Sequence, residues 1–217
     1  MLSLRSFLVV CWLALAAFAL SGARAAGTTP PDAPRPRVVI LGDSITAGYG
    51  LSPDDAYPAI LQEKVDAGHL NYQIVNAGLS GDTTAGGLRR VDWVLRGGAK
   101  VLVIALGGND GLRGIPTTQT EANLAGIIRK ARDKVPGITV IVAGMEMPAS
   151  MGADFARDFD ALFAHVAAMN GALLVPYLLK DVGGIERLNQ ADSIHPTAEG
   201  QRIVAENVWG TLRGVLK

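Results

Sequence analysis

Short apolar runs separated by amphipathic segments are the feature that most constrains the fold of this 217-residue chain. Each run is dense in Val, Ile and Leu, and a helix-length segment lies between most successive runs. The runs are residues 38–41, 74–77, 101–106, 138–143 and 172–175. Their apolarity is continuous rather than alternating, which is typical of strands covered on both faces. The pattern predicts β-α units around a central, about five-stranded parallel sheet.

Helical periodicity fills the gaps between the runs. We expect helices over about residues 58–67, 84–95, 119–135, 153–169 and 197–216. In the fourth of these, Phe155, Phe159, Phe163 and Val166 recur at spacings of three and four, which predicts a buried stripe. Without an internal repeat or a second-domain boundary, the chain is expected to form one domain over residues 37–217, a three-layer α/β/α sandwich.

The N-terminal residues have a different character. Residues 1–25 have the pattern of a signal peptide, with Arg5, an apolar run over 7–20 and the small-x-small sequence Ala23-Arg24-Ala25. Because the run is shorter than the roughly 20 residues of a spanning helix, a cleaved signal is favoured over a membrane anchor. Residues 26–36 are expected to form a Pro-rich tail. The mature protein is therefore expected to be periplasmic or secreted from a bacterium, with no stable membrane insertion.

Charge and cysteine content exclude several classes of function. Lys plus Arg equals Asp plus Glu at 20 each, and removal of Arg5 and Arg24 leaves a net charge of −2. Such a balance gives no general attraction to nucleic acid. Cys11 is the only cysteine and lies in the signal, so the mature chain has no thiol nucleophile and no disulfide. The three histidines form no spaced ligand set, and we expect neither metal nor cofactor.

Three residues near opposite ends of the chain match a hydrolytic triad. Ser44 follows the first apolar run, and Asp192 and His195 precede the last helix. An imidazole takes the proton of a serine hydroxyl, and a carboxylate holds that imidazole in the right tautomer. The alternatives are a helix-capping role for Ser44 and a turn-forming role for Asp192. We interpret His69 and His165 as structural or solvated.

Two further residues are candidate donors to an oxyanion. Gly81 follows the second apolar run and offers an unobstructed backbone N–H, and Asn109 follows the third run and offers a side-chain amide. The alternatives are a turn glycine and a loop-capping asparagine. Ligands bind beyond the carboxyl ends of parallel strands, so both residues are expected to lie near Ser44.

Residues of the expected substrate groove are apolar and lie in loops. Leu112 and Ile115 belong to a loop with glycines beside Asn109, and Met147 and Pro148 follow the fourth run. Methionine adapts to varied shapes, which suits contact with an acyl chain. The alternative for each of the four residues is ordinary loop packing.

Four motifs in this chain resemble those of the SGNH hydrolase superfamily, the GDSL esterases and lipases. They are Gly42-Asp43-Ser44, Ser80-Gly81-Asp82-Thr83, Gly107-Gly108-Asn109-Asp110 and Asp192-Ser193-Ile194-His195-Pro196. The chain is most similar to the bacterial periplasmic branch of arylesterases, acyl-CoA thioesterase I and lysophospholipase L1. The resemblance implies a flavodoxin-like fold, Ser44 as nucleophile, His195 as base and Asp192 as its orienter. It also implies an oxyanion hole made by the N–H groups of Ser44 and Gly81 and the Asn109 side chain.

The expected function is hydrolysis of small acyl or aryl esters, and of thioesters or lysophospholipids, through an acyl-enzyme. A carbohydrate O-acetylesterase of the cell envelope would use the same triad with a more polar groove. A non-catalytic ligand-binding module is the alternative from another class, although neither G-x-G-x-x-G after the first strand nor a P-loop is present. We expect a small-molecule ester as the partner, and a monomer.

Overall fold

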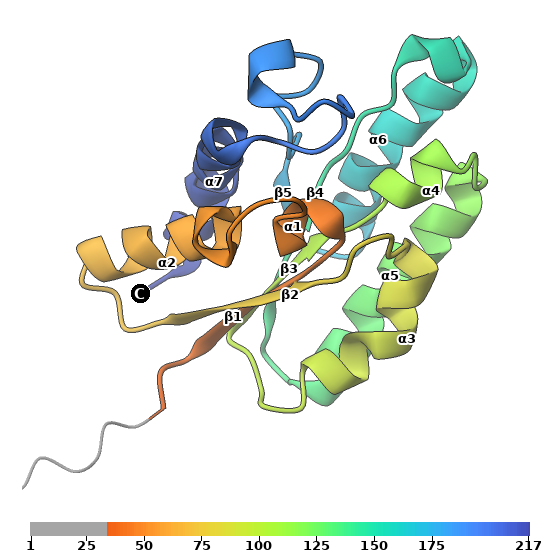
Figure 1. Ribbon diagram of the computed structural model, residues 1–217. Helices are drawn as coiled ribbons and strands as arrows, with labels where there is room; N and C mark the ends of the chain where they lie inside the picture. The colour runs from red at the N-terminus through yellow and green to blue at the C-terminus, as the bar shows by residue number, and fades with distance from the viewer. Residues whose placement is uncertain (1–33) are drawn as a thin grey trace, which may run out of the picture. The chain divides into compact units, whose positions relative to one another are not determined.

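A five-stranded sheet forms the centre of the computed structural model, which describes residues 34–217 (Figure 1). The strands are β1 (Arg37–Gly42), β2 (Gln73–Gly78), β3 (Val101–Ala105), β4 (Thr139–Ala143) and β5 (Leu173–Val175). All neighbouring pairs are parallel, in the order β2-β1-β3-β4-β5. The predicted parallel sheet is confirmed. The predicted signal peptide, residues 1–25, and most of the predicted tail, residues 26–36, lie outside the described residues.

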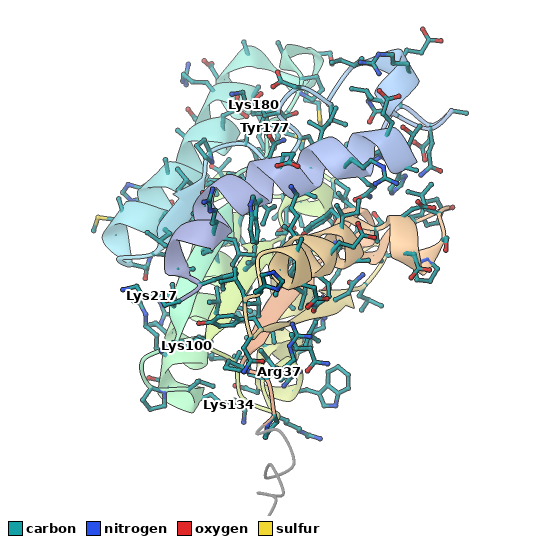
Figure 2. The ribbon with its side chains drawn as sticks, turned by 90° about the vertical axis from the view of Figure 1, so that its left-hand side faces the viewer. Arg37, Lys100, Lys134, Tyr177, Lys180 and Lys217 are labelled. Carbon is teal, nitrogen blue, oxygen red and sulfur yellow. The ribbon has the colours of Figure 1, made fainter. Side chains whose placement is uncertain are left out.

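Helices cover both faces of the sheet. They are α1 (Ser44–Ala47), α2 (Tyr57–Ala67), α3 (Thr84–Val94), α4 (Gly108–Leu112), α5 (Thr117–Lys134), α6 (Ala153–Met169) and α7 (Ala198–Leu212). Helices α2 and α7 pack together on one face, while α3, α5 and α6 pack in succession on the other (Figure 1). In Figure 2, turned by 90°, α7 lies in front of the sheet beside α2. The predicted three-layer α/β/α class is confirmed.

The core is aliphatic along the central strands and aromatic beneath α6. Phe159 and Phe163 are fully buried, and their ring centroids lie 5.3 Å apart in an edge-to-face arrangement. Phe155 is partly buried, with its ring 5.8 Å from that of Phe159. The stripe predicted from the spacing of three and four is confirmed, because these side chains recur on the face of α6 that meets the sheet.

The structure differs from the sequence prediction in three places. The helices α1 and α4 were not predicted, because four or five residues are too few to show a helical period. Helix α7 ends at Leu212 and a short 3₁₀ turn follows, so the expected helix was too long. Strands β2 and β5 are not covered on both faces as expected, because they are the edges of an open sheet.

The strand order places a switch point at the carboxyl end of β1. The chain leaves β1 to form β2 on one side and later returns to form β3 on the other. Connections that depart to opposite sides leave a crevice beyond this strand end, where ligands bind in sheets of this type. No helix among residues 34–217 is long and apolar enough to cross a membrane.

One glycine at the same edge is required by close packing of the backbone. Gly144 follows β4, donates its N–H to the Val175 carbonyl at 2.8 Å and accepts from the Leu178 N–H at 2.9 Å. A Cβ atom at Gly144 would lie 2.1 Å from the Pro176 carbonyl oxygen. Pro176 lies between Val175 and Leu178, which are both hydrogen-bonded to Gly144, so its carbonyl oxygen has little room to move.

We expect Gly144→Ala to lower the free energy of unfolding by about 2 kcal/mol, because the added methyl group overpacks a rigid site. This corresponds to a fall of about 4–8 °C in Tm, measured by thermal unfolding. Gly210→Ala in α7 is the matched control, since no atom lies near its added methyl group. That control should raise stability by up to about 1 kcal/mol. Equal Tm values for the two variants would contradict the packing argument.

Candidate active site

A cavity of about 690 Å³ opens beyond the carboxyl ends of the strands. Four of the predicted chemical residues line it, namely Ser44, Gly81, Asn109 and His195. Of the residues predicted to contact substrate, Leu112, Met147 and Pro148 line the cavity. Ile115 does not line it: the chain leaves the cavity wall after α4, and Ile115 donates its N–H to the Asp110 carbonyl at 3.0 Å. The cavity is where the structure brings the sequence motifs together.

Ser44 is the first residue of α1, directly after the end of β1. The helix cap is Asp43, whose Oδ1 accepts the Ile45 N–H at 3.0 Å. The capping role considered for Ser44 is therefore wrong, and its hydroxyl is free to face the cavity. The first N–H groups of a helix have no acceptor within that helix, which leaves the Ser44 N–H available to a ligand.

His195 lies between Ser44 and Asp192. The Ser44 Oγ is 2.8 Å from His195 Nε2, and His195 Nδ1 is 2.7 Å from Asp192 Oδ2. The other carboxylate oxygen, Oδ1, accepts the backbone N–H groups of His195 at 3.0 Å and Ile194 at 2.9 Å. These hydrogen bonds, first from the His195 backbone, then from its ring and then from Ile194, lower the pKa of Asp192 to about 2. Asp192 thus stays ionised and fixes both the loop and the ring.

Two residues outside the predicted set hold the serine and histidine segments together. Gln190 donates its backbone N–H to the His195 carbonyl at 2.7 Å and its Nε2 to the Tyr49 carbonyl at 2.8 Å. The Tyr49 ring lies 4.6 Å from the His195 ring, centroid to centroid. Neither residue type carries a signal in a single sequence, because the partners are backbone groups and a ring face.

Gly81 has the conformation and the space that an N–H donor to substrate needs. Its φ is +77°, and a Cβ atom there would meet nothing nearer than Arg113 Nη2 at 3.9 Å. A Cβ at Gly78 would instead lie 2.3 Å from the Ala47 nitrogen, inside the packed domain. Of these two glycines, only Gly81 lines the cavity, as predicted.

Arg90 joins the strand ends on which the two N–H donors are built. It donates to the Gly42 carbonyl at the end of β1 and to the Ala77 carbonyl in β2, both at 2.8 Å. Its Nε also lies 2.7 Å from Asp82 Oδ2 in a largely buried ion pair. Arg90 therefore fixes the separation between the segments that carry Ser44 and Gly81.

Asn109 lies in α4, and its neighbour Asp110 anchors this helix to the rest of the domain. The buried Asp110 accepts the Thr84 N–H at 2.9 Å and also bonds the Thr84 and Thr120 hydroxyl groups, which anchors α4 to α3 and α5. The Asn109 Nδ2 lies 3.4 Å from Asp43 Oδ2. A side-chain amide has two N–H donors, so a second one is left for a ligand.

The described residues offer no metal site. No group of three or more His, Cys, Asp or Glu side chains within residues 34–217 is arranged to hold an ion. The other two histidines lie outside the cavity: His165 pairs with Glu121 at 3.1 Å, and His69 is exposed.

Comparison with known proteins identifies the family to which the chain belongs. The model of the GDSL-like lipase/acylhydrolase family matches residues 40–203, which span every site residue above. The chain belongs to this family. The predicted superfamily is confirmed, and with it the class of enzyme, a serine hydrolase that acts on ester bonds.

Individual members of the GDSL-like family resemble the chain over most of its length. Esterase TesA of Pseudomonas aeruginosa is 39% identical over 201 residues, 92% of this chain and 99% of that protein. Thioesterase 1/protease 1/lysophospholipase L1 of Escherichia coli is 33% identical over 170 residues, 78% of this chain and 79% of that protein. The structure of the psychrotrophic esterase EstA from Pseudoalteromonas superposes with a TM-score of 0.77 at 29% identity, covering 82% of this chain and 97% of that one.

The aspartate of the GDSL-like motif, Asp43, is buried beneath the site. Its side chain is only 4% exposed, and burial raises its pKa from 3.8 to about 6. The Ile45 N–H and the proximity of His195 oppose this rise. Because the folded pKa exceeds the unfolded one, the contribution of Asp43 to stability is most favourable below about pH 4 and becomes less favourable as the pH rises through about 6.

Asp43→Asn should therefore stabilise the fold at pH 8, by up to about 3 kcal/mol, since a neutral amide removes the cost of a buried charge. The gain should shrink toward zero as the pH approaches 4. Denaturant unfolding of both proteins at pH 4.5, 6 and 8 measures it. A difference that does not change with pH would contradict this interpretation of Asp43.

Proposed function

We propose that the chain is a serine esterase that hydrolyses small acyl and aryl esters through a covalent acyl-enzyme. The observation that carries the proposal is the continuous hydrogen-bonded series from Ser44 Oγ through His195 to Asp192, with links of 2.8 and 2.7 Å, at the wall of the cavity. A serine nucleophile needs a base within hydrogen-bond reach, and that base needs an orienting group.

In the first half-reaction, Ser44 Oγ attacks the ester carbonyl carbon while His195 Nε2 takes the hydroxyl proton. The imidazolium that forms is stabilised by Asp192, which stays ionised because of its low pKa. His195 then donates the proton to the leaving alkoxide, which departs as an alcohol. Water repeats the sequence on the acyl-enzyme, releases the acid and restores Ser44.

Negative charge on the carbonyl oxygen of the tetrahedral intermediate requires donors fixed in advance. The N–H groups of Ser44 and Gly81 and the Asn109 amide are proposed for this role. Their support is rigid: Arg90 ties the first two segments together, and Asp110 anchors the helix of the third.

The cavity lining supports an apolar acyl or aryl substrate over an acetylated sugar. The wall beyond the triad includes a set of apolar side chains, namely those of Leu112, Met145, Met147, Pro148 and Leu179. Apolar walls contribute binding energy in proportion to the apolar area that they remove from water. The names of the relatives, an esterase and a thioesterase/lysophospholipase, support thioesters and lysophospholipids as further substrates.

Export is proposed from the sequence alone. Residues 1–25 have the three-part pattern of a cleavable signal, and the remaining chain contains no cysteine. The mature enzyme would then act in the periplasm or outside the cell.

Asn109→Ala tests the proposed oxyanion hole. We expect kcat for p-nitrophenyl butyrate to fall about 100-fold, about 3 kcal/mol of barrier, because one donor to the transition state is lost. KM and Tm should change little. The Ser44→Ala protein is the blank, and acetylated xylose is the comparison substrate. An unchanged kcat would remove Asn109 from the site, and turnover of the acetylated sugar alone would contradict the proposed substrate class.

A further inference from the structure

The ionisable groups that line the cavity include acidic side chains but no lysine or arginine. Apart from His195 and two tyrosines, they are the carboxylates of Asp43 and Glu146, and no lysine or arginine lines the cavity. Asp43 lies beneath Ser44, whereas Glu146 belongs to the segment after β4. A partly enclosed, apolar cavity focuses the field of such charges on whatever enters it.

Glu146 has two polar neighbours. Its pKa is raised by partial burial and by the charge of Asp160, which accepts the Met147 N–H at 3.1 Å. The pKa of Tyr177 is raised to about 12, by burial first and then by the charges of Glu146 and Asp160. Figure 2 shows Tyr177 far from Arg37 and Lys100, which lie where β1 and β3 begin. Tyr177 and the carboxylates near it, those of Glu146 and Asp160, thus lie at the end of the domain that contains the cavity.

Asn189, which also lines the cavity, has a side-chain acceptor with no donor. Its Nδ2 donates to the Val182 carbonyl at 2.7 Å and to the Ile185 carbonyl at 2.9 Å, which fixes the orientation of the amide. Its Oδ1 is buried and has no hydrogen-bond partner within residues 34–217. An unsatisfied buried acceptor is costly, and a bound donor would remove that cost.

Tyr177 and Asn189 face the same short segment of chain. A Cβ at Gly183 would lie 2.4 Å from the Tyr177 hydroxyl oxygen, and the preceding Val182 carbonyl is one of the two that hold Asn189. Glu146, Tyr177 and Asn189 therefore form one acceptor-rich part of the cavity lining, which we call the acceptor wall.

We propose that the acceptor wall binds an ammonium group on the substrate, so that the enzyme prefers cationic esters to neutral or anionic esters of the same size. An ammonium group has a positive charge, three N–H donors and no acceptor, which complements a carboxylate, an amide oxygen and a hydroxyl oxygen. The cations near these residues do not line the cavity: Lys180 is three residues from Tyr177, and Arg187 is two residues from Asn189. The inference rests on the proposed esterase function and specifies its substrate class.

The test compares isosteric esters. For the acyl side, the p-nitrophenyl esters of 6-aminohexanoate, heptanoate and adipate present a cation, a methyl group and an anion at similar positions. For the alcohol side, 2-aminoethyl and propyl hexanoate present the cation on the leaving group. Variants are Glu146→Gln, which removes the charge, and Tyr177→Phe, which removes the hydroxyl group. Glu63→Gln, an exposed acid outside the cavity, is the matched control.

In the unmodified enzyme, kcat/KM is expected to be highest for the cationic ester of at least one series and lowest for the adipate ester. Glu146→Gln should lower the cation-to-neutral ratio of kcat/KM about fivefold, as for a partly screened charge pair. Tyr177→Phe should lower it less, and Glu63→Gln should leave it unchanged.

Two results separate failure of the inference from failure of the proposed function. Ser44-dependent hydrolysis with equal rates for cationic and neutral esters in both series would overturn the acceptor wall and leave the esterase function intact. The same preference in wild type and Glu146→Gln would also overturn it. Hydrolysis that persists in Ser44→Ala would instead overturn the proposed function.

Discussion

Parallel pairing of β1 with β2 and β3 is the constraint on which the site depends. Because all five strands run in the same direction, their carboxyl ends meet at one edge, and Ser44, Gly81 and Asn109 follow three of these ends. The hydrogen bond between Ser44 and His195 joins residues 151 positions apart. A parallel sheet, in which every crossover returns the chain to the same edge, is one arrangement that brings such distant segments within 3 Å.

Charged side chains then fix what the sheet has brought together. Arg90 ties the ends of β1 and β2 to Asp82, and Asp192 both shapes its own loop and holds His195. Asp43 is the exception, since its carboxylate is buried at a cost in stability that rises with pH. A destabilising buried charge next to the proposed nucleophile is the kind of cost in stability that functional sites retain.

Sequence patterns predicted the sheet, the five long helices and most of the polar residues that the structure brings together at the cavity. The sheet and helices were predictable because continuous apolar runs separated by helix-length segments are typical of buried parallel strands. The polar residues were predictable because Ser, His and Asn in the loops at strand ends have distinctive chemistry. The patterns failed for α1 and α4, which at four and five residues are too short to repeat a helical period, and for Ile115, which was assigned to the groove from its place in the loop alone. Gln190 and Arg90 escaped prediction because each acts largely through backbone carbonyls, which no sequence pattern marks.

The central claim is that Ser44 is a nucleophile activated by His195, and covalent labelling measures this directly. A p-nitrophenyl phosphonate ester transfers its phosphonyl group to an activated serine and releases p-nitrophenol. Its relevance is supported by the EstA relative, whose structure is described as inhibited by monoethylphosphonate. Intact mass and peptide mapping should show one adduct per chain, on Ser44, absent in Ser44→Ala and formed at least 100-fold more slowly in His195→Ala. An adduct on another residue, or labelling of Ser44 at the same rate without His195, would contradict the account.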